Sequence, residues 1–201
     1  MTPDVVYKHM RAEHADLFLR GRVRVSALAY FRRIEGAPDG IQDTYEGNTV
    51  GKADVVSLHE NASGDLKRKM ARLGQSGTRL ILGGTYTLEV PPVFILSFSM
   101  LDTLGLFGTD YDRVMAVHGV GELARRILRA NPDLFETAYG NRVTYGPTSF
   151  AAGVDEAIEP NPWLKNSDLA WEEEFRLVFI PKQPFGVDFL DVEFSPLNKE
   201  S

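Results

Sequence analysis

The stretch AWEEEFRLVFIP, residues 170–181, places three consecutive glutamates directly before an apolar run. Successive side chains of a β-strand point to opposite faces, so Glu172, Glu174 and Arg176 would share one face and the apolar side chains the other. Because the apolar face must meet a core, the two glutamates would lie on the opposite surface, about 7 Å apart along the strand. The stretch therefore predicts either paired carboxylates facing a cleft, suited to acid–base work or to stabilising positive charge, or a solvated sheet face.

Helical spacing of apolar residues recurs at three places in the chain. Residues 12–19 and 119–132 show it clearly, and Gly21 is well placed to end the first of these helices. A third, short helix is expected within residues 63–74.

Alternating and continuous apolar runs predict strands between these helices. Two β-rich runs around Gly83-Gly84 predict a hairpin. Residues 36–64 are rich in Gly, Asp and Asn, which predicts a long loop with a short strand at residues 53–59. The other expected strands are residues 4–10, 22–26, 93–99, 112–119, 141–146, 173–181 and 186–194.

The irregular order of these elements determines the expected fold class. Regular strand–helix alternation is missing, so we expect an α+β fold with mixed, mostly antiparallel sheets and a few inserted helices. The 201 residues suit a single domain, residues 1–201, with 43% hydrophobic and 25% charged residues as in ordinary globular proteins. The N-terminus lacks an apolar signal region and no apolar run approaches a membrane span, so we expect a cytoplasmic protein that does not enter the membrane.

Composition and motifs make several functions improbable. The chain has no cysteine, and its four histidines are scattered, so neither a thiolate nor a histidine metal site is expected. No lysine follows the glycine-rich segments in P-loop register, and no G-x-S-x-G motif is present. Ser97 and Ser99 lie on an expected buried strand, where the simplest role is to cap its end. The net charge of −6 does not indicate nucleic-acid binding, although a local basic patch would be enough to bind a phosphate.

The segment that starts at residue 27 and ends at residue 47 combines aromatic and charged residues. Tyr30 and Phe31 precede Arg32 directly, and further charged residues follow. A guanidinium next to an aromatic pair could hold a nucleotide, with the cation on phosphate and a ring on the base. The alternative is core aromatics followed by a solvated loop with internal salt bridges.

The chain also resembles a known group of proteins. The pieces VYKHM, FLRGRVRVSALAYFRRIE, DTYEG, VFILSFS and AWEEEFRLVFIP are similar, in order and spacing, to a diverse bacterial and phage group described mostly as a domain of unknown function. The plan of that group resembles the ADP-ribosyltransferase fold, including DarT-like toxin and antiphage enzymes. In that superfamily a first strand has a His or Arg, a middle strand a Tyr or Ser, and a late strand a Gln/Glu-x-Glu motif.

The resemblance implies roles for the matching residues. His9 matches the first strand, Ser97 or Ser99 the middle strand, and Glu172-x-Glu174 the late strand. It implies an NAD-dependent ADP-ribosyltransferase acting on a protein or nucleic acid, plausibly in phage–host conflict or antiviral defence. Glu174 would stabilise the ribose as nicotinamide leaves, and Glu172 would orient or deprotonate the acceptor.

The same resemblance assigns the ligand contacts. Tyr7 and His9 would hold a ribose, and Arg32, after Tyr30-Phe31, would meet the pyrophosphate. Two alternatives stay open: a non-catalytic module that binds a nucleotide or a protein on the same fold, and a structural or host-interaction protein with solvated glutamates. A glycosidase is disfavoured because its two carboxyl groups usually come from different elements.

Overall fold

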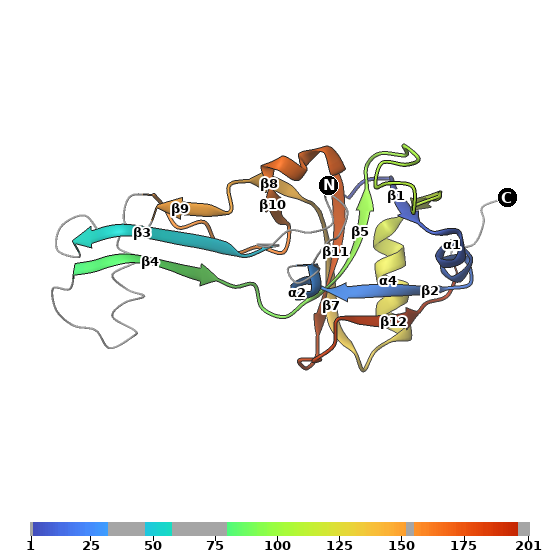
Figure 1. Cartoon of the computed structure of the whole chain (residues 1–201). Helices are drawn as coiled ribbons and strands as arrows, with labels where there is room; N and C mark the ends of the chain where they lie inside the picture. The colour runs from blue at the N-terminus through green and yellow to red at the C-terminus, as the bar shows by residue number, and fades with distance from the viewer. Residues whose placement is uncertain (1, 32–46, 58–79, 152–154, 197–201) are drawn as a thin grey trace.

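The computed structural model describes residues 2–31, 47–57, 80–151 and 155–196, and all structural statements below concern these residues. The backbone forms a compact body and a narrow arm of strands that extends from it (Figure 1). The helices are few: α1 (Ala12–Leu19), α2 (Leu28–Phe31), α4 (Val120–Ala130) and the 3-10 helix η1 (Ser167–Glu172). The strands are β1 (Val5–Met10), β2 (Arg22–Ala27), β3 (Thr49–Ser57), β4 (Leu80–Leu88), β5 (Phe94–Ser99), β6 (Arg113–His118), β7 (Phe135–Arg142), β8 (Thr144–Gly146), β9 (Ser149–Ala151), β10 (Leu164–Asn166), β11 (Glu174–Pro181) and β12 (Phe189–Glu193).

The body is built on a seven-stranded sheet in which every pairing is antiparallel. Its path runs β12-β2-β5-β1-β6, and β11 joins the other edge of β5 and carries β7 beyond it. Outside this sheet β3 pairs antiparallel with β4, and short parallel pairings join β8 with β10 and β3 with β9. The expected class, mixed α and β with a mostly antiparallel, curled sheet and few helices, is confirmed.

One edge of β5 is shared by two strands that diverge from each other. β2 pairs with β5 at Phe94 and Ile95, and β1 pairs with it at Ser99. Between these points the Ser97 carbonyl accepts a hydrogen bond from Lys8 Nζ at 2.7 Å. A lysine side chain thus satisfies a backbone group at the fork of the sheet, where no strand pairing is recorded.

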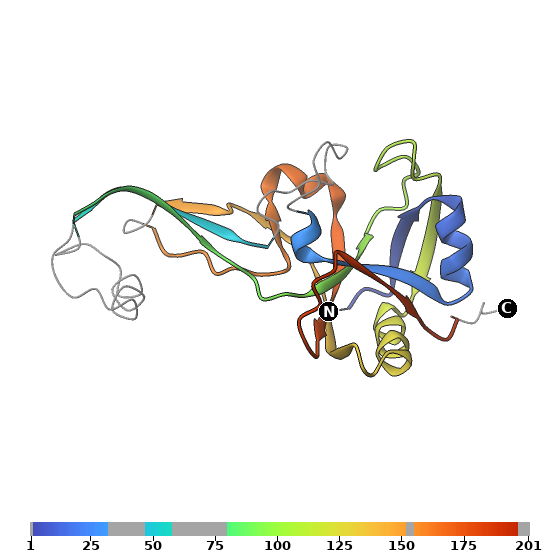
Figure 2. The same cartoon turned by 60° about the horizontal axis from the view of Figure 1, so that its bottom comes forward.

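The two faces of the sheet have different cores. One face packs on α1 and α4 and holds the larger core, which includes Phe98, Leu123, Phe175 and Phe179. The other face holds a smaller core of Leu28, Val90, Val93, Ile95 and Val178. Figure 2 shows α4 lying against the sheet of the body, away from the arm. Because Val178 shares its strand face with Glu174 and Arg176, the charged residues of β11 continue the smaller core.

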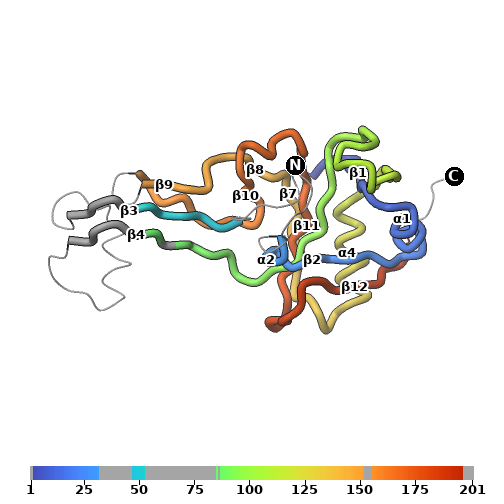
Figure 3. The backbone as a smooth tube through the Cα atoms, viewed as in Figure 1, coloured from blue at the N-terminus to red at the C-terminus, as the bar shows by residue number. Residues whose placement is uncertain are grey.

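The arm corrects the predicted hairpin. β4 runs straight through Gly83-Gly84 and pairs along its length with β3, so that Gly84 lies opposite Ala53. Two glycines permit a tight turn but do not force one when a partner strand offers continuous pairing. β3 begins at Thr49 inside the expected loop, and β9 adds a third strand (Figure 3).

Most other expected elements are confirmed. The strands within residues 4–10, 22–26, 93–99 and 112–119 and the helices at residues 12–19 and 119–132 all form. Gly21 follows α1 with φ 83°, the left-handed conformation that ends helices. The stretch 141–146 is divided between β7 and β8. The helix expected within residues 63–74 and much of the expected loop lie outside the described residues. No helix among the described residues is both long and apolar enough to cross a membrane.

Candidate functional site

Three of the residues singled out in the sequence lie side by side across three adjacent strands. Tyr7 on β1 is opposite Ser99 on β5, and Ser99 is opposite Glu174 on β11. Residues directly opposite one another in a sheet project from the same face. The first, middle and late strands therefore place Tyr7, Ser99 and Glu174 in one row, which we call the Tyr7–Ser99–Glu174 row.

Glu172 does not lie on the strand, which corrects the sequence prediction. It is the last residue of η1, and β11 begins only at Glu174. Between them Glu173 has φ 42° and ψ 52°, the left-handed conformation, so the backbone turns before the strand starts. Strand alternation thus fails for Glu172, whereas it holds for Glu174 and Arg176.

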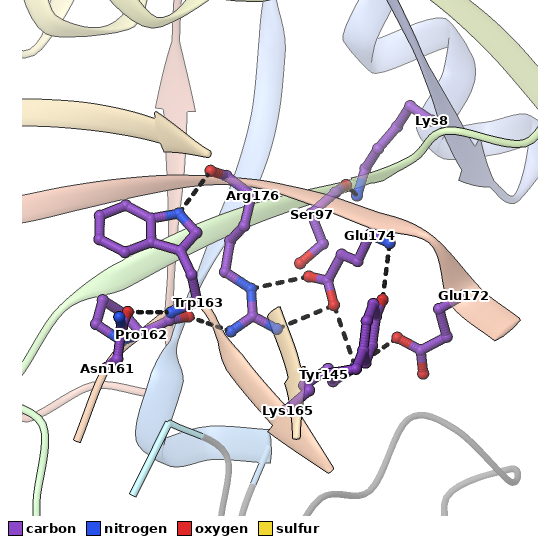
Figure 4. A network of polar contacts seen from close by, with 10 residues as sticks. All are labelled: Lys8, Ser97, Tyr145, Asn161, Pro162, Trp163, Lys165, Glu172, Glu174 and Arg176. Atoms are coloured by element: carbon purple, nitrogen blue, oxygen red, sulfur yellow. Dashed lines mark hydrogen bonds and ion pairs between the residues drawn. The ribbon is translucent and has the colours of Figure 1, made fainter. Parts of the chain in front are cut away.

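The two glutamates are nonetheless joined by a lysine that the sequence did not single out. Lys165 Nζ on β10 lies 2.5 Å from Glu172 Oε2 and 3.1 Å from Glu174 Oε2. Arg176 donates from Nε to Glu174 Oε1 at 2.9 Å and from Nη2 to Glu174 Oε2 at 3.0 Å. Figure 4 shows the four side chains converging from η1, β10 and β11. We call these four residues the ionic cluster.

The ionic cluster is buried, so the prediction of a solvated sheet face is wrong. The exposed fractions are 2% for Glu172, 6% for Glu174, 5% for Lys165 and 1% for Arg176. Two carboxylates and two cations balance in charge. The charges of buried side chains need to balance, because an uncompensated buried charge lowers the stability of the fold by several kcal/mol.

Uncharged groups form hydrogen bonds around the ionic cluster. The Tyr145 hydroxyl oxygen accepts from the Glu174 backbone N–H at 2.8 Å. Arg176 also donates from Nη1 to the Pro162 carbonyl, and its own carbonyl accepts from Trp163 Nε1 at 3.1 Å. These contacts fix the ends of β11 and β10 relative to each other (Figure 4).

The surroundings shift the pKa of three groups. Burial would raise the pKa of Glu174, but Arg176, Lys165 and hydrogen bonds from Arg176 and Ser97 outweigh it, so the pKa falls far below its ordinary value and the carboxylate stays ionised. Burial lowers the pKa of Lys8 to about 8 despite the opposing effect of Glu174. Burial, reinforced by the nearby Glu174 and Glu172 charges, raises the pKa of Tyr145 to about 12.

His9 lies two residues beyond Tyr7 on the same face of β1, but its contacts are separate from the ionic cluster. Its Nε2 lies 2.9 Å from the Leu101 carbonyl, and its ring meets Phe107 edge-on with centroids 4.9 Å apart. Its buried Nδ1 has no hydrogen-bond partner among the described residues. Burial lowers the pKa of His9, which favours the neutral ring.

The two serines hold the strand end and the carboxylate. Ser99 Oγ donates to the Glu172 carbonyl at 2.9 Å and accepts from the Leu101 backbone N–H at 3.0 Å. This is the capping role weighed for it in the sequence. Ser97 is the serine that hydrogen-bonds the Glu174 carboxylate.

The aromatic pair near residue 30 contacts the smaller core and Phe189. Phe31 packs against the smaller core, and Tyr30 meets Phe31 at 5.6 Å and Phe189 at 6.1 Å between ring centroids. Phe31 therefore acts as a core aromatic, one of the two roles considered. Arg32 lies outside the described residues.

Lys165 and Tyr145 are site residues that sequence reasoning missed. Lys165 follows Trp163-Leu164 in a short segment with no periodicity, and Tyr145 sits on a three-residue strand. One signal was present: a lone lysine directly after apolar residues, close to a glutamate run, is a candidate buried partner for carboxylates.

Comparison of the chain with protein-family models, curated proteins and solved structures gives no match. The features that bear on function are therefore the Tyr7–Ser99–Glu174 row, the ionic cluster and the neighbouring His9.

Proposed function

We propose that this chain is an ADP-ribosyltransferase-like protein that binds NAD over the Tyr7–Ser99–Glu174 row, with Glu174 as its catalytic carboxylate. The supporting observation is the row itself, in which Glu174 and Ser99, two residues that the resemblance matches to the late and middle strands, are in register with Tyr7, the residue it assigns to a ribose.

The Glu174 carboxylate of the row suits this reaction. Transfer breaks the bond between ribose C1′ and nicotinamide and forms a bond from C1′ to the acceptor, and positive charge grows on the ribose in between. An ionised carboxylate beside C1′ stabilises that charge. The depressed pKa of Glu174 keeps it ionised throughout the physiological range. Glu172, tied to Glu174 through Lys165, would orient the acceptor or take its proton.

The residues around the row fit the nucleoside parts of NAD better than its pyrophosphate. Tyr7 offers a hydroxyl, and His9 offers an acceptor at Nδ1. Lys8, Lys165 and Arg176 are directed to groups of the protein itself. Arg32 is the proposed phosphate contact.

A second function is favoured by the pairing of Glu174. Its two oxygens already contact Arg176 and Lys165, and its side chain is buried. A carboxylate held in this way would need to exchange one contact before it could face a ribose. The second candidate is therefore a non-catalytic module that binds a nucleotide, or a protein in phage–host conflict, and keeps the ionic cluster as a structural element.

The experiment that separates the two uses NAD labelled in the adenylate part. Wild-type protein is incubated with bacterial lysate, and label on macromolecules and free nicotinamide are measured. Glu174→Gln is the test variant, and Glu173→Gln, an exposed neighbour, is the matched control. If the chain is an enzyme, wild type and Glu173→Gln should both transfer label. Glu174→Gln should lower the rate of label transfer by at least about a hundredfold.

The binding module predicts a different pattern. Calorimetry would detect a nucleotide or a captured protein, with no label and no nicotinamide from any variant. If wild type transfers no label and calorimetry detects no NAD binding, the enzyme hypothesis is rejected.

A further inference from the structure

A cluster of rings lies beside the row and takes no part in the ionic cluster. Phe107, in the loop between β5 and β6, contacts His9, and its ring centroid lies 6.1 Å from that of Tyr111 and 5.7 Å from that of Trp171. Trp171, directly before Glu172, is 40% exposed. We call these four residues the ring cluster. It reaches from the buried face of β1 to the surface.

The buried imidazole of the ring cluster has an open acceptor. Because the Leu101 carbonyl can only accept, the proton of the neutral His9 ring lies on Nε2, and Nδ1 has a free lone pair. This Nδ1 is buried and has no partner within the described part of the chain. Buried polar atoms are nearly always hydrogen-bonded, so an open one calls for a donor that the described residues do not supply here.

The loop over His9 is held weakly at its tip. The hydrogen bonds recorded for the described backbone of residues 103–109 stay inside the loop, such as Leu106 N to Thr103 O and Gly108 N to Gly105 O. Gly105 and Gly108 have φ 82° and 92°, and a Cβ at either would meet nothing within 4 Å. The Phe107 ring attaches the tip to His9 and Trp171 of the body.

We propose that the ring cluster is a binding site for a planar heteroaromatic ring that bears an N–H donor. The ring takes the place that Phe107 occupies in this structure, lies beside Trp171 and Tyr111, and donates its N–H to His9 Nδ1. The amino group of adenine and the carboxamide of nicotinamide both supply this chemistry. The inference rests on the proposed function only for the origin of the ring in NAD, since ring binding itself requires no transfer.

The proposal differs from the role that the resemblance implies for His9. There the histidine would meet a ribose hydroxyl, whereas here it meets the ring. Adenosine and purine riboside separate the two, because they share the ribose and only adenosine has the amino group. Nicotinamide and N,N-dimethylnicotinamide form the second pair, which differs in the carboxamide N–H.

The test is calorimetry of the full chain with these four compounds, together with Trp fluorescence. We expect adenosine or nicotinamide to bind and its partner without the N–H to bind about tenfold more weakly, since a buried acceptor is then left unpaired. The fluorescence change should vanish in Trp171→Phe. Equal binding within both pairs would overturn the proposal.

Two variants test the proposal even if the Phe107 ring hinders binding in wild type. Phe107→Ala empties the place beside His9 and should tighten ring binding severalfold, whereas Phe189→Ala, which removes a partly exposed ring elsewhere, should not. His9→Phe keeps a ring but removes the acceptor, and should abolish the preference for the N–H compounds. If neither adenosine nor nicotinamide binds wild type or Phe107→Ala, the proposal is wrong.

The outcome is separable from that of the proposed function. Ring binding without label transfer would leave this inference standing and reject the enzyme. Label transfer that is unaffected by Phe107→Ala and His9→Phe, with no preference for the N–H compounds, would reject this inference and leave the enzyme standing.

Discussion

Arg176 holds both carboxylate oxygens of Glu174, two residues before it on the same strand face, through hydrogen bonds of 2.9 and 3.0 Å. A guanidinium matches a carboxylate in this paired geometry, and burial makes the contact strong. The arrangement needs only an alternating strand, so the sequence alone predicted that the two side chains share a face.

Removal of Arg176 should destabilise the protein strongly. Arg176→Met leaves Glu174 with Lys165, which already contacts Glu172, so one buried negative charge loses its balance. We expect a loss of about 3 to 5 kcal/mol in the free energy of unfolding, measured by urea denaturation. Arg24→Met is the control: Arg24 pairs with Asp191 on an exposed strand, and such pairs contribute about 1 kcal/mol or less. Equal losses would show that burial of the Glu174 pair contributes nothing.

Acid should remove part of this stability through Glu174. The folded-state pKa lies below the ordinary 4.5, so the contribution is complete above that value and is lost as pH falls through the folded pKa. We expect the stability difference between wild type and Glu174→Gln to shrink steadily as the pH is lowered below about 5. Carboxylates common to both proteins cancel in this difference. A difference that stays constant with pH would mean that the native state does not hold Glu174 ionised.

Lys8 should give a trend of the same sign at alkaline pH. Its folded pKa of about 8 lies below the ordinary 10.5, so between these values the unfolded chain binds more protons and the stability due to Lys8 rises with pH. We expect the stability of wild type relative to Lys8→Met to rise by about 3 kcal/mol from pH 7 to pH 10.5. Tyr145, whose raised pKa acts in the other direction above pH 10, is present in both proteins. A flat difference would place Lys8 Nζ in water.

The candidate site was predictable where local periodicity determines it, and only there. Strand alternation paired Glu174 with Arg176, whereas only the resemblance singled out Tyr7 and the pair Ser97 and Ser99. Alternation failed at Glu172, because nothing in a run of three glutamates indicates that the middle one adopts a left-handed conformation.

Long-range contacts explain what else was missed. Lys165 reaches the ionic cluster only because β10 pairs in parallel with β8, a register that no local pattern contains. The pairing of β4 with β3 likewise overrides the turn propensity of Gly83-Gly84, because a continuous ladder satisfies more backbone groups than a hairpin at that point would.

Two glycines with the same backbone conformation provide a matched pair of alanine substitutions. Gly21 follows α1, and Gly105 lies in the loop between β5 and β6. Gly21 and Gly105 have nearly identical φ values, 83° and 82°, so alanine pays the same cost of about 1 to 2 kcal/mol for the left-handed conformation at either site. A Cβ at Gly21 would also lie 2.1 Å from the Phe194 carbonyl oxygen, whereas one at Gly105 meets nothing within 4 Å. Phe194 N–H donates to the Gly21 carbonyl at 2.7 Å, so the two backbones cannot separate without loss of that bond. Thermal unfolding should therefore show Gly21→Ala to be less stable than Gly105→Ala by at least about 1 kcal/mol, the contribution of a single hydrogen bond. Equal melting temperatures would mean that the segment after β12, which carries Phe194, is not docked against the end of α1.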